Sequence, residues 1–90
     1  MVYVNVRHTV ADYAKWRQGF DGNESFRRTA GATGSKKVYR DQENPNTVTV
    51  IMEWNNADQA RKFTQDPRLK EVMEQAGVIG APEIRFLNEA

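Results

Sequence analysis

Cysteine is absent from this 90-residue chain, and histidine occurs once, as His8. Without cysteine there is no disulfide framework, no thiolate nucleophile, and no cysteine-based zinc or iron–sulfur site. A single imidazole excludes any site that needs two histidines, so we expect no metal site and no cofactor. No apolar run approaches the roughly 20 residues of a membrane-spanning helix, so we expect no membrane partner.

A charge surplus of either sign is also missing, because 13 Lys and Arg face 12 Asp and Glu, for a net charge of +1. A nucleic-acid-binding protein carries a basic surplus on one face, so we expect no nucleic-acid partner. The first residues lack the basic start and apolar stretch of a signal peptide, which favours a cytoplasmic protein. The length predicts a single domain over residues 1–90, with a thin core that would gain from self-association.

Four segments show the alternation or composition of β-strands. Residues 2–8 place valines on one face and polar or aromatic side chains on the other, and residues 47–54 form the clearest strand. Residues 35–40 and 83–87 are shorter candidates. The turn-forming composition of residues 41–46 separates the two middle strands.

Two helical segments lie between these strands. The first has Thr9 as its expected N-cap and carries Tyr13, Trp16 and Phe20 at helical spacing, to about Asp21. Whether Gly22 breaks this helix or only bends it stays open. The second segment is expected to begin after the cap Asn56, to restart at Asp66-Pro67 and to stop at Gly77.

The order strand, helix, strand, strand, helix, strand predicts a ferredoxin-like α+β fold, βαββαβ, with an antiparallel four-stranded sheet. Both helical segments then cover the valine-rich face of the sheet. The other face mixes aromatic, apolar and charged side chains, which suits a second sheet packing over it around a small polar-lined space. We therefore expect a homodimer whose lumen is lined by Tyr3, Arg7, Tyr39, Glu53 and Arg85.

Several motifs resemble the dimeric α/β-barrel superfamily, close to the antibiotic biosynthesis monooxygenase group, and the resemblance covers nearly the whole chain. They are the segments 13–16, 31–34, 48–54, 60–63, 66–70 and 80–84. The resemblance implies that two ferredoxin-like subunits pair sheet to sheet into a dimeric α/β barrel. It also implies a ligand pocket in each subunit, between the sheet and the helices.

The haem-degrading branch of this superfamily is tested by three positions. The chain resembles that branch in having Asn5 on its first strand and Trp54 at the end of its third. The branch also needs an iron-ligating histidine on the second helix, where this chain has Met73. We therefore do not expect haem degradation.

The cofactor-free monooxygenase branch needs only a general base, an oxyanion donor and a dry pocket, because the deprotonated substrate itself reduces O2. The resemblance implies a catalytic group of Asn5, His8 and Trp54. In it His8 or a water near the substrate is the base, while the other two hold the oxyanion. The substrate, a small aromatic or polyketide-type molecule, would be bound by Tyr13, Trp16, Phe20, Phe63 and Met73.

Structural alternatives stay open for these residues. Trp54 and His8 also fit a packing role at strand ends, Arg7 and Glu53 fit an ion pair across neighbouring strands, and the pair Arg27-Arg28 fits a solvated face. A second hypothesis is a non-enzymatic homodimer of the same fold, which binds a small ligand or serves in stress. Isomerase or cyclase chemistry in the same pocket is a third.

Overall fold

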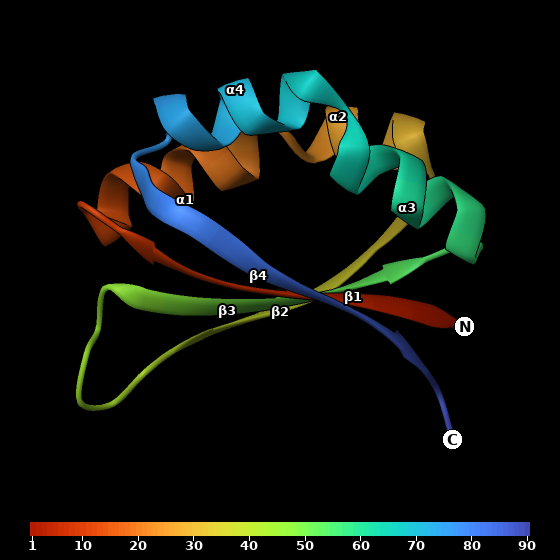
Figure 1. The fold of residues 1–90 in the computed structure, drawn as a ribbon, viewed down its shortest axis with the longest axis horizontal. Helices are drawn as coiled ribbons and strands as arrows, with labels where there is room; N and C mark the ends of the chain where they lie inside the picture. Colours follow the sequence, from red (N-terminus) through yellow and green to blue (C-terminus); the bar gives the residue numbers. More distant parts are fainter.

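An antiparallel sheet with the strand order β2-β3-β1-β4 forms one layer of this computed structural model, and four helices form the other (Figure 1). All 90 residues are described. The elements are β1 (Val2–Val10), α1 (Tyr13–Gly22), α2 (Glu24–Ala30), β2 (Ala32–Arg40), β3 (Thr47–Trp54), α3 (Ala57–Gln65), α4 (Pro67–Gln75) and β4 (Val78–Asn88). The predicted ferredoxin-like α+β fold is confirmed, with each helical segment divided in two.

The helices cover a single face of the sheet, and the opposite face is bare (Figure 1). Because side chains alternate along a strand, the valine-rich face points to the helices and builds the core. The buried core residues are Val4, Val6, Val10, Trp16, Ala32, Val48, Val50, Met52, Trp54, Ala60 and Phe63. This is the face that the sequence pattern assigned to the helices.

Gly22 ends the first helix, which answers the question that the sequence left open. Asn23 occupies the break, and its backbone N–H donates to the carbonyls of Gly19 and Phe20. Its side-chain amide donates to the Gly19 carbonyl at 2.8 Å. These bonds satisfy the last carbonyls of α1, which have no partner within the helix. No helix in the structure combines the length and apolar character required to cross a membrane.

The start of α1 differs from the expectation. Thr9 does not cap the helix, because β1 continues through it and pairs it with Thr47 in β3 and Ile79 in β4. Asp12 is the N-cap instead, and its carboxylate accepts a hydrogen bond from the Lys15 backbone N–H at 3.2 Å.

The caps predicted for the second helical segment are confirmed. Asn56 accepts from the Gln59 backbone N–H at 2.9 Å at the start of α3. Asp66 accepts from the Arg68 backbone N–H at 2.9 Å, and Pro67 stands at the first position of α4.

The two outer strands are longer than predicted. β2 begins at Ala32 rather than residue 35, with an irregular register as far as Lys36. β4 begins at Val78 rather than residue 83, because pairing with β1 resumes on both sides of a register shift between Arg7 and Thr9. The extra residues of this shift include Pro82. Proline has no backbone N–H to donate, and a bulge in an edge strand tolerates this because no ladder hydrogen bond is lost there.

Candidate functional site

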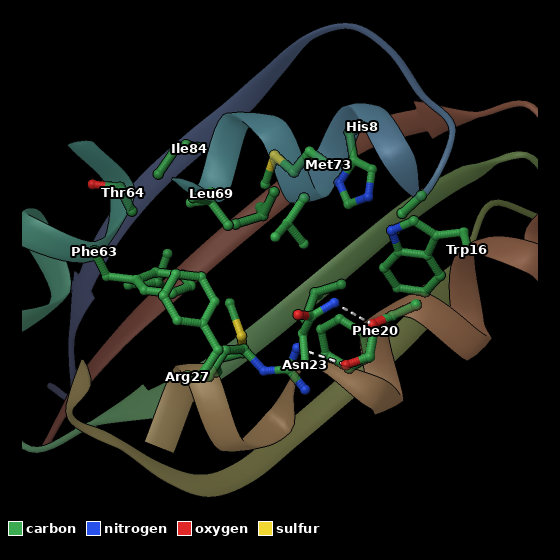
Figure 2. Close-up of a pocket in the computed structure, with 18 residues that line it drawn as sticks. His8, Trp16, Phe20, Asn23, Arg27, Phe63, Thr64, Leu69, Met73 and Ile84 are labelled. Atoms are coloured by element: carbon green, nitrogen blue, oxygen red, sulfur yellow. Dashed lines mark hydrogen bonds between the residues drawn. The ribbon is translucent and has the colours of Figure 1, made fainter. Parts of the chain in front are cut away.

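A pocket lies between the central strands of the sheet and the helix layer (Figure 2). Its cavity measures about 60 Å³, and 13 of its 18 lining residues are hydrophobic. The aromatic wall comes from α1, where the rings of Trp16 and Phe20 stack with centroids 5.0 Å apart. Phe63 of α3 and Met73 of α4 line the pocket from other helices. Such walls suit an apolar or aromatic molecule.

His8 brings the first polar group into this pocket, from β1. The residue is 6% exposed, and neither Nδ1 nor Nε2 has a hydrogen-bond partner. Its ring packs against Trp16 with the centroids 5.4 Å apart. Burial lowers the pKa of His8 below its ordinary value of 6.5, so the imidazole is neutral at pH 7. One nitrogen is then free to accept a proton and the other to donate a hydrogen bond.

Arg27 of α2 brings the second polar group, and it is also 6% exposed. Its Nη1 donates to the Phe20 carbonyl at 2.7 Å, and its guanidinium lies 3.9 Å from the centroid of the Phe20 ring. Its Nη2 has no partner. Burial lowers the pKa of Arg27, but a guanidinium in a protein stays protonated. The pocket therefore contains one fixed positive charge.

A groove between α4 and β4 adjoins the pocket. It measures about 480 Å³. Four residues line both the groove and the pocket, and they form the wall between them: Thr64, Leu69, Met73 and Ile84. Met73 is an unbranched, flexible side chain, so this wall is the part of the pocket that yields most easily.

The structure brings together five of the eight residues predicted to act on or bind a substrate. These are His8, Trp16, Phe20, Phe63 and Met73. Tyr13 lies outside the pocket and behind Trp16, with ring centroids 5.8 Å apart. The Tyr13 ring also contacts Arg40, whose guanidinium lies over it, 4.0 Å from the ring centroid.

Asn5 and Trp54 do not line this pocket, so the predicted catalytic group is not one cluster. Asn5 lies on the bare face of β1, opposite Ile51 and Arg85, and its Oδ1 has no partner. Trp54 faces the helices at the far end of β3. It is fully buried against Phe63, with the ring centroids 4.9 Å apart and its Nε1 unpartnered.

The separation of Trp54 from His8 follows from strand register. His8 pairs with Val48, and Trp54 lies six residues farther along the same strand. That is roughly 20 Å at about 3.3 Å per residue. A small substrate at His8 is therefore out of reach of the Trp54 indole.

The bare sheet face carries the five residues predicted for a dimer lumen, but with a different pairing from the one expected. Arg7 forms its ion pair with Asp41 at 3.1 Å and not with Glu53. The carboxylate of Glu53 instead accepts hydrogen bonds from Thr33 at 2.8 Å and from Tyr3 at 3.4 Å. The expectation of an Arg7–Glu53 pair is wrong, because Glu53 stands opposite Tyr3 in the register.

The rest of this face is open. Arg85 pairs with Glu83 at 3.0 Å along its own strand. Tyr39 is 51% exposed, and Leu87, another residue of this face, is 41% exposed. The hydrogen bond that Tyr3 donates to the Glu89 carboxylate raises the pKa of Tyr3.

Arg27 is the pocket residue that the sequence interpretation missed, because the pair Arg27-Arg28 was expected to form a solvated face. Only Arg28 is exposed. Its spacing from Phe20 is no guide to its position, because α1 ends at Gly22 and Arg27 lies in the separate helix α2. No three or more His, Cys, Asp or Glu side chains gather where they could hold a metal ion.

Comparison with known proteins identifies the fold. No protein-family model matches the sequence, and no curated protein matches it. Among solved structures, a Bordetella bronchiseptica protein provisionally named an antibiotic biosynthesis monooxygenase superposes with a TM-score of 0.82 at 16% identity. The match covers 99% of this chain and 96% of that one.

Two further structures agree. SnoaB from Streptomyces nogalater, described as a cofactor-independent oxygenase, has a TM-score of 0.76 at 18% identity, over 99% of this chain and 92% of its own. A Deinococcus radiodurans protein, provisionally named in the same way as the first, has a TM-score of 0.71 at 16% identity, over 100% and 93% of the two chains. This chain therefore has the ferredoxin-like α+β fold of the antibiotic biosynthesis monooxygenase structures.

Proposed function

We propose that this chain is a cofactor-independent monooxygenase-like protein that oxidises a small aromatic or polyketide-type molecule in the pocket between sheet and helices. The observation that carries the proposal is His8, a neutral imidazole with both nitrogens unpartnered on the wall of a largely hydrocarbon cavity. An unpartnered buried polar group is costly, and a ligand that hydrogen-bonds to it removes that cost. The likeness in fold to a cofactor-independent oxygenase supports the same reading.

The reaction requires an acidic carbon, such as the methylene of an anthrone. The unprotonated nitrogen of His8 removes a proton from that carbon, and the carbanion spreads its charge onto the neighbouring carbonyl oxygen. The electron pair of the carbanion then reduces O2, and a C–O bond forms. Protonation gives a hydroperoxide, which loses water to leave a carbonyl. The balance is CH2 plus O2 to C=O plus H2O, so the substrate supplies all four electrons that reduce O2, and no separate reductant is needed.

The pocket suits this chemistry by what it excludes. Its walls are mostly hydrocarbon, which limits the water that would quench the carbanion. O2 is itself apolar and partitions into such a cavity. At about 60 Å³ the cavity takes one part of a two- or three-ring substrate. The groove beyond Met73 takes the remainder when that side chain rotates.

Oxygen uptake with an anthrone tests the proposal. We expect one O2 consumed per quinone formed, without hydrogen peroxide, and roughly 100-fold slower turnover for His8→Gln. Thr9→Ala is the matched control, since Thr9 is the exposed neighbour on the opposite face of β1. Catalysis that His8→Gln leaves unchanged would remove His8 as the base.

Two other outcomes separate the remaining hypotheses. If Asn5→Ala abolishes turnover and His8→Gln does not, the chemistry lies on the bare face of the sheet. If an anthrone binds in the pocket but is oxidised no faster than in buffer, the chain is a ligand-binding protein and not an enzyme.

The proposal includes a homodimer formed through the bare face of the sheet. This face presents Tyr39, Ile51 and Leu87 beside its charged groups, and Asn5 Oδ1 is buried there without a partner. A second sheet packed over this face would bury the three apolar and aromatic side chains and bring a hydrogen-bond donor to Asn5 Oδ1. Sedimentation velocity should give a dimer that Leu87→Glu converts to monomer, while Lys62→Glu on exposed α3 does not. If the unmodified protein sediments as a monomer, the proposed homodimer is wrong.

A further inference from the structure

Arg27 is a buried cation whose charge is incompletely matched by the protein. Its neighbours are the Phe20 carbonyl, which accepts from Nη1 at 2.7 Å, and the Phe20 ring, over which the guanidinium lies. A carbonyl dipole and an aromatic face both attract a cation, but neither carries a full negative charge. Nη2 is buried with no acceptor, in a residue that lines the pocket.

The nearest carboxylates are committed elsewhere. Asp21 forms an ion pair with Arg17 at 3.1 Å, and Glu24 forms one with Lys36 at 2.7 Å. Arg27 takes part in no salt bridge, although both acids lie close enough to influence its charge. A buried charge without a counter-ion is costly, and a guanidinium fork matches carboxylate or enolate oxygens well.

The lining of the pocket supplies no anion either. Figure 2 shows Arg27 reaching in from α2, among Phe20, Asn23 and Phe63, with His8 on the sheet side. None of the 18 lining residues is an aspartate or a glutamate. The pocket thus has mostly apolar walls, one cation and one neutral imidazole, and no lining side chain carries a negative charge.

We infer that Arg27 binds an anionic oxygen of the ligand, so that the pocket selects small aromatic molecules bearing a carboxylate or an acidic enol over neutral ones of the same shape. The inference deepens the proposed function and rests on it for the place of binding. In the oxidation above, the same Nη2 holds the oxygen onto which the carbanion spreads its charge. Arg27 thereby takes the role for which the sequence suggested Asn5 and Trp54.

A purely structural role for Arg27 makes a different prediction. Its bond to Phe20 caps the carboxyl end of α1, where a cation is favourable. If that were its whole role, removing the charge would lower stability and weaken all ligands equally. Anion recognition instead changes the ratio of affinities for a charged and a neutral ligand, which is independent of the fraction of folded protein.

The test measures binding of naphthoate and naphthamide by isothermal titration calorimetry. The two probes share shape and differ in charge. We expect the unmodified protein to prefer naphthoate at least tenfold, the range of one charge-assisted hydrogen bond. Arg27→Met should abolish the preference. Arg27→Gln, which keeps a polar side chain without the charge, should abolish it too and serves as the second variant if the methionine variant does not fold. Arg28→Met, the exposed neighbour, should keep it.

The outcomes separate this inference from the proposed function. Equal affinity for the two probes in the unmodified protein overturns it, as does a preference that survives both Arg27 variants, or no binding of either probe. Equal affinity combined with quinone formation would leave the oxygenase standing without anion recognition. A preference that depends on Arg27, combined with no oxygen uptake, would leave a receptor for aromatic anions that is not an oxygenase.

Discussion

Replacing Trp54 with phenylalanine tests whether this residue is a packing element or a hydrogen-bond donor. The indole is fully buried, packs against Phe63, and has an Nε1–H with no acceptor. Phenylalanine keeps an aromatic ring on Phe63 and removes that unpaired donor. Because the lost packing is offset by the loss of an unpaired buried donor, the substitution should be mild for so deeply buried a position.

Two opposing contributions set its magnitude. Tryptophan is larger than phenylalanine by roughly 40 Å³, which at about 24 cal/mol per Å³ of cavity costs about 1 kcal/mol. Lost apolar burial adds about 1 kcal/mol. Removing an unsatisfied buried N–H returns about 1–3 kcal/mol. The net change in the free energy of unfolding for Trp54→Phe therefore lies between a loss and a gain of about 1 kcal/mol, against a loss of about 3–5 kcal/mol for Trp54→Ala.

Urea denaturation at one fixed protein concentration measures these differences, since an oligomer's stability depends on concentration. Trp16→Phe is the matched control. Trp16 is nearly as buried as Trp54, but its N–H is not among the buried unpartnered atoms. Removing that N–H therefore brings no compensating gain, and Trp16→Phe should lower the free energy of unfolding by about 2 kcal/mol. A loss of 3 kcal/mol or more for Trp54→Phe would refute the reasoning, because it would show that the Trp54 N–H has a partner in solution.

Four further predictions concern stability. Burial lowers the pKa of His8, so the unfolded chain binds more protons than the folded one below about pH 6.5. The free energy of unfolding should therefore fall as the pH drops through that value. Urea melts at several pH values should show this slope for the unmodified protein and not for His8→Gln, and a slope that the substitution leaves unchanged would contradict the prediction. Gly31→Ala should cost about 1–3 kcal/mol in the same melts, because φ is +126° and the new Cβ would lie 2.6 Å from Gln59 Cδ. Gly22→Ala, with open space around it, should cost nothing or stabilise slightly. Asn56→Ala should cost about 1 kcal/mol by removing the cap on Gln59, and a neutral result would mean that the end of α3 is capped by water.

The fold followed from the sequence because its signals are local. The alternation over residues 47–54 and the caps Asn56 and Asp66 specify strand and helix starts without tertiary information. The start of β4 did not follow, because Gly80, Ala81 and Pro82 have the composition of a turn. Only pairing with β1 across a register shift makes them part of a strand, and that pairing is a property of the folded sheet.

The sequence predicted the candidate site only in part. Trp16 and Phe20 lie four residues apart and share the inner face of α1, as the spacing predicts, whereas Tyr13 falls beside that face. The separation of Asn5 from His8 was already present in the strand pattern, because residues an odd number apart point to opposite faces of a sheet. The resemblance grouped them as one catalytic set, and the alternation of β1 divides them.

Arg27 could not be placed from local signals, since the groups that compensate its burial exist only in the folded chain. In a continuous helix the Phe20 carbonyl would accept from the backbone N–H of residue 24. Because α1 ends at Gly22, that carbonyl instead accepts a long bond of 3.3 Å from the Asn23 N–H and has capacity left for the Arg27 guanidinium. The break between α1 and α2 thus allows a cation to be buried beside the pocket. It follows that this break and Arg27 are linked: a change that made the helix continuous would withdraw the Phe20 carbonyl, return Arg27 to solvent and remove the positive charge from the pocket.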